Sequence, residues 1–246
     1  MTLVAILSFS YGGLQVIKIE EVEVYGWRAA IRGMRNAKNS WDKMDSEFSI
    51  ENSVRYSRFI PCVEVGKNDM KLMQSLSKGG DDHGKFLRMI IVWLDITAPL
   101  YFWKEFDTYK VGTVSNSCST MHKLTDKEFT MDDFSFDHLT DGSRDQVAAP
   151  LVNVLNGARD AYINYDKYNE EDPEGWDNGV SCKKDVWWQM IQLLPSSYNQ
   201  KRTIQLNYQV LKTMYHARKN HKLDEWKEFC AWCESLPYFK EICITE

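Results

Sequence analysis

The chain has 246 residues, of which 43% are hydrophobic and 13% aromatic, so it is long enough to bury the core of a globular domain. Its formal net charge of −5 argues against a nucleic-acid polymer as partner, and no stretch approaches the roughly 20 apolar residues of a membrane span. Six cysteines in a chain of this length do not form the dense framework of a small secreted protein, so we expect a cytoplasmic protein with no membrane partner.

The first residues differ in character from the rest. Residues 1–15 contain an apolar run with no basic residue ahead of it, which is not the pattern of a secretory signal. We interpret them as an N-terminal extension and residues 16–246 as a single domain. An acidic stretch near residues 169–181 is interpreted as a loop insertion in that domain.

Short elements are expected early in the domain. Residues 16–24 alternate partly in polarity and predict a strand, and residues 27–34 predict a helix directly after it. A second helix is expected over residues 69–77, with Asn68 as its N-cap and an end at Gly79.

The middle of the chain contains a run typical of a buried strand. Residues 90–96 are apolar except at one position. Thr97 is expected to be the N-cap of a helix with Pro99 at or near its first position, and this helix is predicted to continue to about residue 109. The polar residues 111–122 that follow are expected to form a loop.

The C-terminal part is expected to be largely helical. Helices are predicted over residues 146–168 and 185–194, and one long helix is predicted from Leu206 onward, because no Gly or Pro occurs before Pro237.

Asn207 and Arg218 are expected on one face of that long helix. They are eleven positions apart in the sequence, which is about three turns and roughly 16 Å along the axis. Together they offer a neutral amide and a fork of guanidinium donors, which suits an elongated anionic ligand. An exposed arginine and an unrelated asparagine are the alternative.

Two segments resemble a known family. Leu194-Pro195, eleven further residues, Asn207, ten more, Arg218 and a nearby His221 are similar in order and spacing to the C-terminal half of the flavin-dependent thymidylate synthase (ThyX-like) family. The run Ile90–Tyr101 is similar to the strand, Ala-Pro turn and following helix of the same family.

The resemblance implies a fold and a set of ligands. The expected fold is α/β (α+β), with a mixed sheet flanked by long helices in a single domain. The expected assembly is a homotetramer whose sites lie between subunits. FAD, a pyrimidine deoxynucleotide such as dUMP, and a folate one-carbon donor are the implied small molecules.

The resemblance also carries residues over to the cofactor site, where several differ from the family pattern. Thr108-Tyr109-Lys110 stands where the family has Arg-His-Arg, Arg88 stands where it has Glu, and Ile191 falls where an Arg is expected. The residues expected to bind the cofactor are His83, Arg88, Lys110, Asn207 and His221.

The substrate site is expected around a cysteine. Cys118 occupies the family's Ser position, where its thiolate could attack C6 of a pyrimidine, contact the substrate, or fill a small structural site. The residues expected to bind the substrate are Lys104, Glu105, Thr108, Ser117, Cys118, Ser119 and Arg218.

Other motifs that could bind a metal or carry redox chemistry have simpler interpretations. Cys230 and Cys233 lie inside a helical pattern rather than opening a helix after a strand, so we expect core or surface thiols. The five histidines have no metal-binding spacing, so no metal is expected.

Two functions follow. The first is a flavin-dependent thymidylate synthase-like transferase acting on a pyrimidine deoxynucleotide. The alternative is a catalytically altered or inactive protein of the same fold that binds or sequesters a nucleotide, as a phage or mobile element could use.

Overall fold

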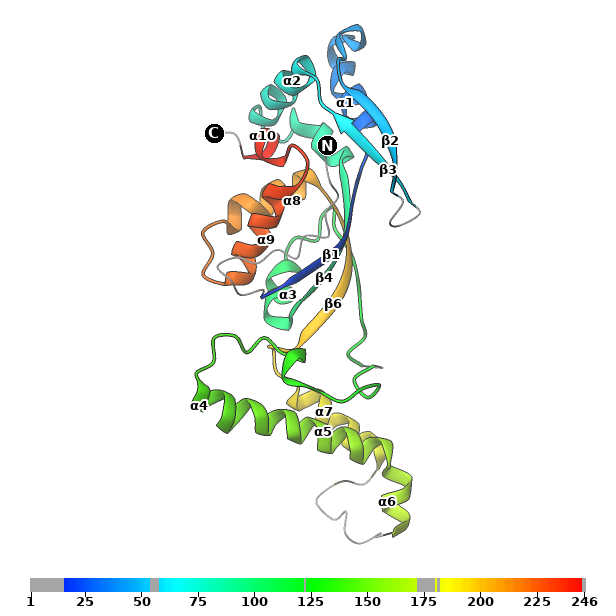
Figure 1. The fold of residues 1–246 in the computed structure, drawn as a ribbon, viewed down its shortest axis with the longest axis vertical. Helices are drawn as coiled ribbons and strands as arrows, with labels where there is room; N and C mark the ends of the chain where they lie inside the picture. Colours follow the sequence, from blue (N-terminus) through cyan, green and yellow to red (C-terminus); the bar gives the residue numbers. More distant parts are fainter. Residues whose placement is uncertain (1–15, 54–57, 122, 172–179, 181, 245–246) are drawn as a thin grey trace. The chain divides into compact units, whose positions relative to one another are not determined.

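The computed structural model describes residues 16–53, 58–121, 123–171, 180 and 182–244 (Figure 1). The expected extension at residues 1–15, and most of the expected insertion at residues 169–181, lie outside these ranges. The chain divides into two compact units. The first unit comprises Met1–Ile96, Phe106–Asn116 and Thr203–Glu246, and the second comprises Thr97–Glu105 and Ser117–Arg202.

A four-stranded sheet forms the framework, in the order β1-β4-β6-β5. β4 and β6 run antiparallel, because the Tyr208 N–H donates to the Ile90 carbonyl and the Leu100 N–H donates to the Tyr198 carbonyl, both at 3.0 Å. Strands and helices are interspersed along the chain, which confirms the α/β (α+β) class expected from the sequence. The strands are β1 (Lys18–Tyr25), β4 (Ile91–Pro99), β5 (Val114–Ser117) and β6 (Asn199–Asn207).

β4 is longer than the sequence predicts. It continues through Pro99, and helix α3 (Leu100–Phe106) begins only there, so the prediction of Thr97 as a helix N-cap is wrong. A residue before proline is sterically held in the extended region, which keeps Ala98 in the strand. The predicted helix end near residue 109 is also too late by about one turn.

The predicted elements at the start of the domain are confirmed, with one correction. β1 is followed by α1 (Trp27–Arg35), and α2 ends at Lys78, but its N-cap is Gly66 rather than Asn68. Gly26 connects β1 to α1 with φ of 97°, and a Cβ there would lie 2.0 Å from the Met89 carbonyl oxygen. The remaining elements are η1 (Asn36–Lys38), η2 (Trp41–Lys43), the antiparallel pair β2 (Glu47–Ser53) and β3 (Arg58–Glu64), α2 (Lys67–Lys78) and η3 (Gly84–Met89).

The predicted long C-terminal helix is wrong. Its first residues belong to β6, and the rest divides into α8 (Tyr208–Arg218), α9 (Asp224–Ser235) and α10 (Phe239–Cys243). The Asn207 side-chain oxygen accepts the Val210 N–H at 3.1 Å, which makes Asn207 the N-cap of α8 rather than a member of it. Figure 1 shows α8 and α9 side by side.

The second unit is mostly helical. The predicted helix over residues 146–168 is interrupted at Asn164, and it opens with a π-helical turn, η5. Pro150 has no N–H to continue the i→i−4 ladder, which accounts for the wider turn before it. The helical segments are η4 (Met131–Asp133), α4 (Asp141–Ser143), η5 (Arg144–Ala148), α5 (Ala149–Ile163), α6 (Tyr165–Glu171) and α7 (Lys183–Leu193).

Each unit has its own core. The first unit buries a group of aromatic rings that includes Tyr208, Trp226 and Phe229, and the second buries a smaller group around Phe129 and Leu155. Among the described helices, none is both long and apolar enough to cross a membrane.

A buried ion pair ties together three segments of the first unit. Arg35 at the end of α1 is 3% exposed, and its Nε donates to Asp69 Oδ1 at 2.7 Å. Asp69 Oδ2 accepts the backbone N–H groups of Asp45 and Ser46, both at 3.0 Å. The carboxylate of a fully buried residue in α2 thus holds both α1 and the segment before β2.

Asp69→Asn should therefore destabilise the protein strongly. It leaves the Arg35 guanidinium buried without its counter-charge, so we expect the free energy of unfolding to fall by about 3–5 kcal/mol. Urea unfolding at neutral pH measures this loss. Asp42→Asn, an exposed position in η2, is the matched control and should change stability by less than about 0.5 kcal/mol. A similar small loss in both variants would contradict the assigned role of the pair.

Candidate functional site

A guanidinium supported by aromatic rings marks the end of α8. Arg218 Nε donates to the Tyr109 hydroxyl at 2.9 Å. The guanidinium carbon lies 4.8 Å from the centroid of the Trp226 ring and 5.6 Å from that of Tyr109. The cation–π contact with Trp226 and the hydrogen bond to Tyr109 therefore fix the direction of this charge.

The Trp226 ring is itself rigidly held. It is fully buried, stacks on Phe106 with 6.3 Å between centroids, and meets Phe229 edge to face at 5.6 Å. His221 lies at the edge of the same cluster, 6.3 Å from Trp226. The His221 Nδ1 accepts the Leu223 N–H at 3.2 Å, so in its neutral form the ring carries its proton on Nε2.

The other end of α8 is fixed by its cap and by a glycine. Gly112 has φ of 79°, and a Cβ there would lie 3.1 Å from both Asn207 Nδ2 and Val210 Cγ2. The segment after α3 therefore touches the start of α8 at Gly112 and its end at Tyr109. The turn at residues 109–112 therefore contacts residues from both ends of α8, the cap at Gly112 and the Arg218 side chain at Tyr109.

Cationic and hydrogen-bond donor groups lie at both ends of α8 and on the segment that follows α3. Lys110 and Thr108 are exposed, Arg218 and Asn207 are half-buried, and the N-terminal end of a helix carries partial positive charge. The two ends of α8 are separated by roughly 16 Å. We call the set Thr108, Lys110, Asn207, Arg218 and His221 the α8 strip. It suits an elongated anion, as the sequence indicated, although Asn207 acts from the cap and not from a helical face.

The remaining predicted cofactor residues belong to a neighbouring element. His83 and Arg88 are exposed, before and within η3, and η3 packs against α8. Gln209 Nε2 also donates to Asp81 Oδ1 at 2.9 Å, which ties the start of α8 to the turn that precedes η3. The start of α8 therefore lies beside η3, with an Asp81 carboxylate held by Gln209 and with exposed His83 and Arg88 on the neighbouring segment.

The predicted nucleophile lies in the second unit. Cys118 is an exposed free thiol directly after β5, a strand formed within the predicted loop over residues 111–122. Its N–H donates to the Lys201 carbonyl at 2.9 Å, and its carbonyl accepts Gln200 Nε2 at 2.8 Å. Both backbone groups of Cys118 are therefore held by β6.

Gln200 connects Cys118 to α3. Its backbone carbonyl accepts Trp103 Nε1 at 3.0 Å, and its side-chain oxygen accepts Arg202 Nε at 3.0 Å. The Arg202 guanidinium carbon lies 4.3 Å from the Trp103 ring centroid. Gln200 belongs to no motif that would predict this role, and its signal in the sequence is the alternation of Gln200, Arg202 and Ile204 along β6.

The other predicted substrate residues occupy flanking positions. Lys104 and Glu105 lie in the last turn of α3, Lys104 exposed and Glu105 half-buried. Ser117 ends β5, and Ser119 Oγ accepts the Met121 N–H at 3.2 Å. The structure thus groups the predicted substrate residues of the second unit around Cys118 and α3. Thr108 and Arg218 belong to the first unit.

Ile191 is a half-buried residue of α7. It packs against the apolar core of the second unit, at the position where the resemblance leads one to expect an arginine. No guanidinium group is therefore supplied from this position.

Three cysteines of the first unit are buried. Cys230, Cys233 and Cys243 are buried free thiols, as the helical pattern predicted for the first two, and burial raises the pKa of Cys230 and of Cys243 to about 12. In the described ranges, no group of three or more His, Cys, Asp or Glu side chains is arranged to hold a metal ion.

The differences in exposure among these cysteines predict that only some of them react with an alkylating reagent. At pH 8 iodoacetamide should modify Cys118 and Cys182, which are exposed, because only an accessible thiolate reacts. Cys230 and Cys243 should react only after unfolding, since at pH 8 a thiol with a pKa of about 12 is almost wholly protonated. Mass spectrometry of peptides from native and urea-treated protein measures both outcomes, and modification of native Cys230 would contradict its burial.

Comparison with known proteins identifies the fold. No family model and no curated protein matches the chain. Two solved structures of the flavin-dependent thymidylate synthase ThyX from Helicobacter pylori, both with FAD and dUMP, align with a TM-score of 0.57 at 16% sequence identity. Each alignment covers 91% of this chain and 97% of the other. The resemblance inferred from motif spacing is thus confirmed at the level of the fold, and the chain has a divergent flavin-dependent thymidylate synthase-like fold.

Proposed function

We propose that this protein is a flavin-dependent thymidylate synthase-like enzyme that acts on a pyrimidine deoxynucleotide, dUMP or a related compound. The observation that supports this most directly is Arg218, fixed over Trp226 at one end of the α8 strip. It lies in a chain whose fold extends over 97% of an enzyme solved with FAD and dUMP.

The α8 strip and η3 carry the proposed binding roles of the first unit. Arg218 and Lys110 bind phosphate oxygens, since a guanidinium matches them bidentately and an ammonium attracts them as a point charge. Asn207, His221, His83 and Arg88 hold FAD. When bound, FAD supplies the hydride chemistry, and a folate supplies the one-carbon unit.

The second unit carries the proposed chemistry on the base. Cys118, with Ser117 and Ser119 on either side, contacts the pyrimidine, and its thiolate is the nucleophile that adds to C6. Gln200 positions this cysteine through the 2.8 Å hydrogen bond to its carbonyl. Lys104, Glu105 and Thr108 contact the substrate.

A specific observation favours a second candidate, binding without turnover. Tyr109 occupies the His position of the family's Arg-His-Arg motif, and its hydroxyl accepts Arg218 Nε. Thr108 and Lys110 replace the two guanidinium groups of that motif. Each charge-assisted hydrogen bond contributes about 1.5–3 kcal/mol, so their loss weakens a site of this kind by several powers of ten.

Assembly is part of the same proposal. We expect a homotetramer with sites between subunits, as the resemblance implies. Sedimentation should give a species of about four times 28.8 kDa at micromolar concentration, and a monomer of 28.8 kDa would contradict sites shared between subunits.

Flavin binding separates the two candidates. If the enzyme proposal holds, protein incubated with FAD and then desalted should retain a 450 nm band. It should also convert dUMP to dTMP when a folate one-carbon donor and a hydride source are added. Protein that stays colourless would rule out the flavin. Calorimetric dUMP binding without flavin and without product would support the binder instead.

Arg218→Ala tests the α8 strip. We expect dUMP affinity to fall by about 2–4 kcal/mol through loss of a charge-assisted contact. We also expect stability to fall by about 1 kcal/mol, because the side chain packs on Trp226. Tyr109→Phe is the matched control, since it removes the 2.9 Å hydrogen bond and keeps the ring and the charge. Unchanged dUMP affinity in Arg218→Ala, measured by calorimetry, would remove Arg218 from the site.

A further inference from the structure

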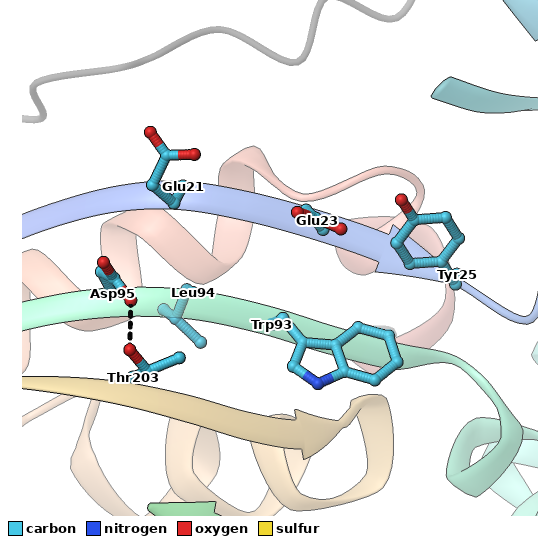
Figure 2. Close-up of a pocket in the computed structure, with 7 residues that line it drawn as sticks. All are labelled: Glu21, Glu23, Tyr25, Trp93, Leu94, Asp95 and Thr203. Atoms are coloured by element: carbon cyan, nitrogen blue, oxygen red, sulfur yellow. Dashed lines mark hydrogen bonds between the residues drawn. The ribbon is translucent and has the colours of Figure 1, made fainter. Parts of the chain in front are cut away.

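A groove lies on a face of the sheet that none of the proposed roles uses. Figure 2 shows it over β1, β4 and the middle of β6, and the residues that line it all belong to the first unit. Its volume is about 520 Å³, which is enough for a small organic molecule. The residues that line it are Glu21, Glu23, Tyr25, Trp93, Leu94, Asp95 and Thr203.

A break in β1 turns its acidic residues toward this groove. In a regular strand Ile19, Glu21 and Glu23 would all face the same way. Ile19 is 5% exposed, whereas Glu21 and Glu23 line the groove. Glu21 has φ of 50°, an unusual conformation for a residue with a Cβ, and such a break reverses the alternation as a β-bulge does. Strain of this kind is typically kept at functional positions.

Two aromatic rings form a corner in the groove. The Tyr25 and Trp93 rings are 5.7 Å apart between centroids and inclined at 71°, and Trp93 is 37% exposed although its neighbours in β4 are buried (Figure 2). Both rings of this edge-to-face pair line the groove, and an accessible aromatic face attracts organic cations.

The charges of the lining match the same ligand. Three of its seven residues are carboxylates, and none is Lys, Arg or His. The Thr203 hydroxyl donates to Asp95 Oδ1 at 2.7 Å and so orients that carboxylate across the strands. The groove is lined by acidic side chains, whereas the α8 strip contains cationic ones. Repulsion between negative charges therefore disfavours binding of a nucleotide, or of the same acidic face of a second copy, in the groove.

We propose that the groove binds an elongated alkylammonium cation of the polyamine class. Glu21, Glu23 and Tyr25 are spaced two residues apart, so they extend over roughly 13 Å along β1. A chain of several ammonium groups can then be met by carboxylates along its length, while one ammonium group lies in the Tyr25–Trp93 corner. The proposal does not depend on the proposed enzymatic function.

Calorimetric titration of the full chain with spermidine at low salt tests this. We expect saturable one-to-one binding that weakens as NaCl is added, because exposed ion pairs are screened. Trp93→Leu should weaken it about tenfold through loss of the cation–π contact. Glu23→Gln should also weaken spermidine binding severalfold. Because this change keeps the shape of the side chain, this variant still tests the proposal if Trp93→Leu folds poorly.

Matched controls come from elsewhere on the surface. Trp41→Leu and Glu128→Gln remove an exposed tryptophan and an exposed carboxylate outside the groove, and both should bind spermidine as the parent protein does. Absence of spermidine binding, or binding that both groove variants leave unchanged, would overturn the proposal. A trilysine peptide that binds where spermidine does not would overturn the small-molecule assignment in favour of a basic protein segment.

Discussion

The strand-to-helix junction at Asn207 is the constraint on which the α8 strip depends. The Asn207 side chain ends β6 and starts α8 in one step, by accepting the Val210 N–H. The direction of α8 follows from this cap, and with it the position of Arg218 three turns later. Gly112 suits the same place, because a φ of 79° is strained for a residue with a Cβ, and a Cβ there would lie 3.1 Å from both the Asn207 amide nitrogen and Val210 Cγ2.

The support of Arg218 is at the same time part of the core. Trp226 is buried among Phe106 and Phe229, and the guanidinium covers the edge of that cluster. A charge held in this way loses little conformational entropy when it binds an anion. Its Nε is already engaged by Tyr109, which leaves fewer donors for a ligand than a guanidinium without an internal partner has. The hydrogen bond to Tyr109 therefore positions the Arg218 guanidinium and also reduces the number of its N–H groups that can bind a ligand.

The second unit holds the backbone of Cys118 firmly and leaves its thiol exposed. Gln200 is central here, since it connects Cys118 with Trp103 of α3 and with Arg202. Ile191 packs into an apolar core where the resemblance leads one to expect a guanidinium. The geometry around the backbone of Cys118 is consequently well defined, whereas position 191 supplies no charge.

The sequence alone determined the elements with strong local signals. The strand ending at Tyr25, the helix after Gly26 and the buried face of β4 follow from periodicity and glycine, and motif spacing was enough to predict the fold. It did not reveal β6, β5 or the division of the C-terminal helix, because the residues 199–207 have a mixed pattern and α8 begins at a side-chain cap without Gly or Pro. The contact of Arg218 with Tyr109, the support of Cys118 by Gln200 and the reversal at Glu21 were decided only by tertiary structure. The first two depend on contacts between segments far apart in the chain, and the third depends on a strained φ within a sheet. Local sequence propensity encodes neither kind of feature.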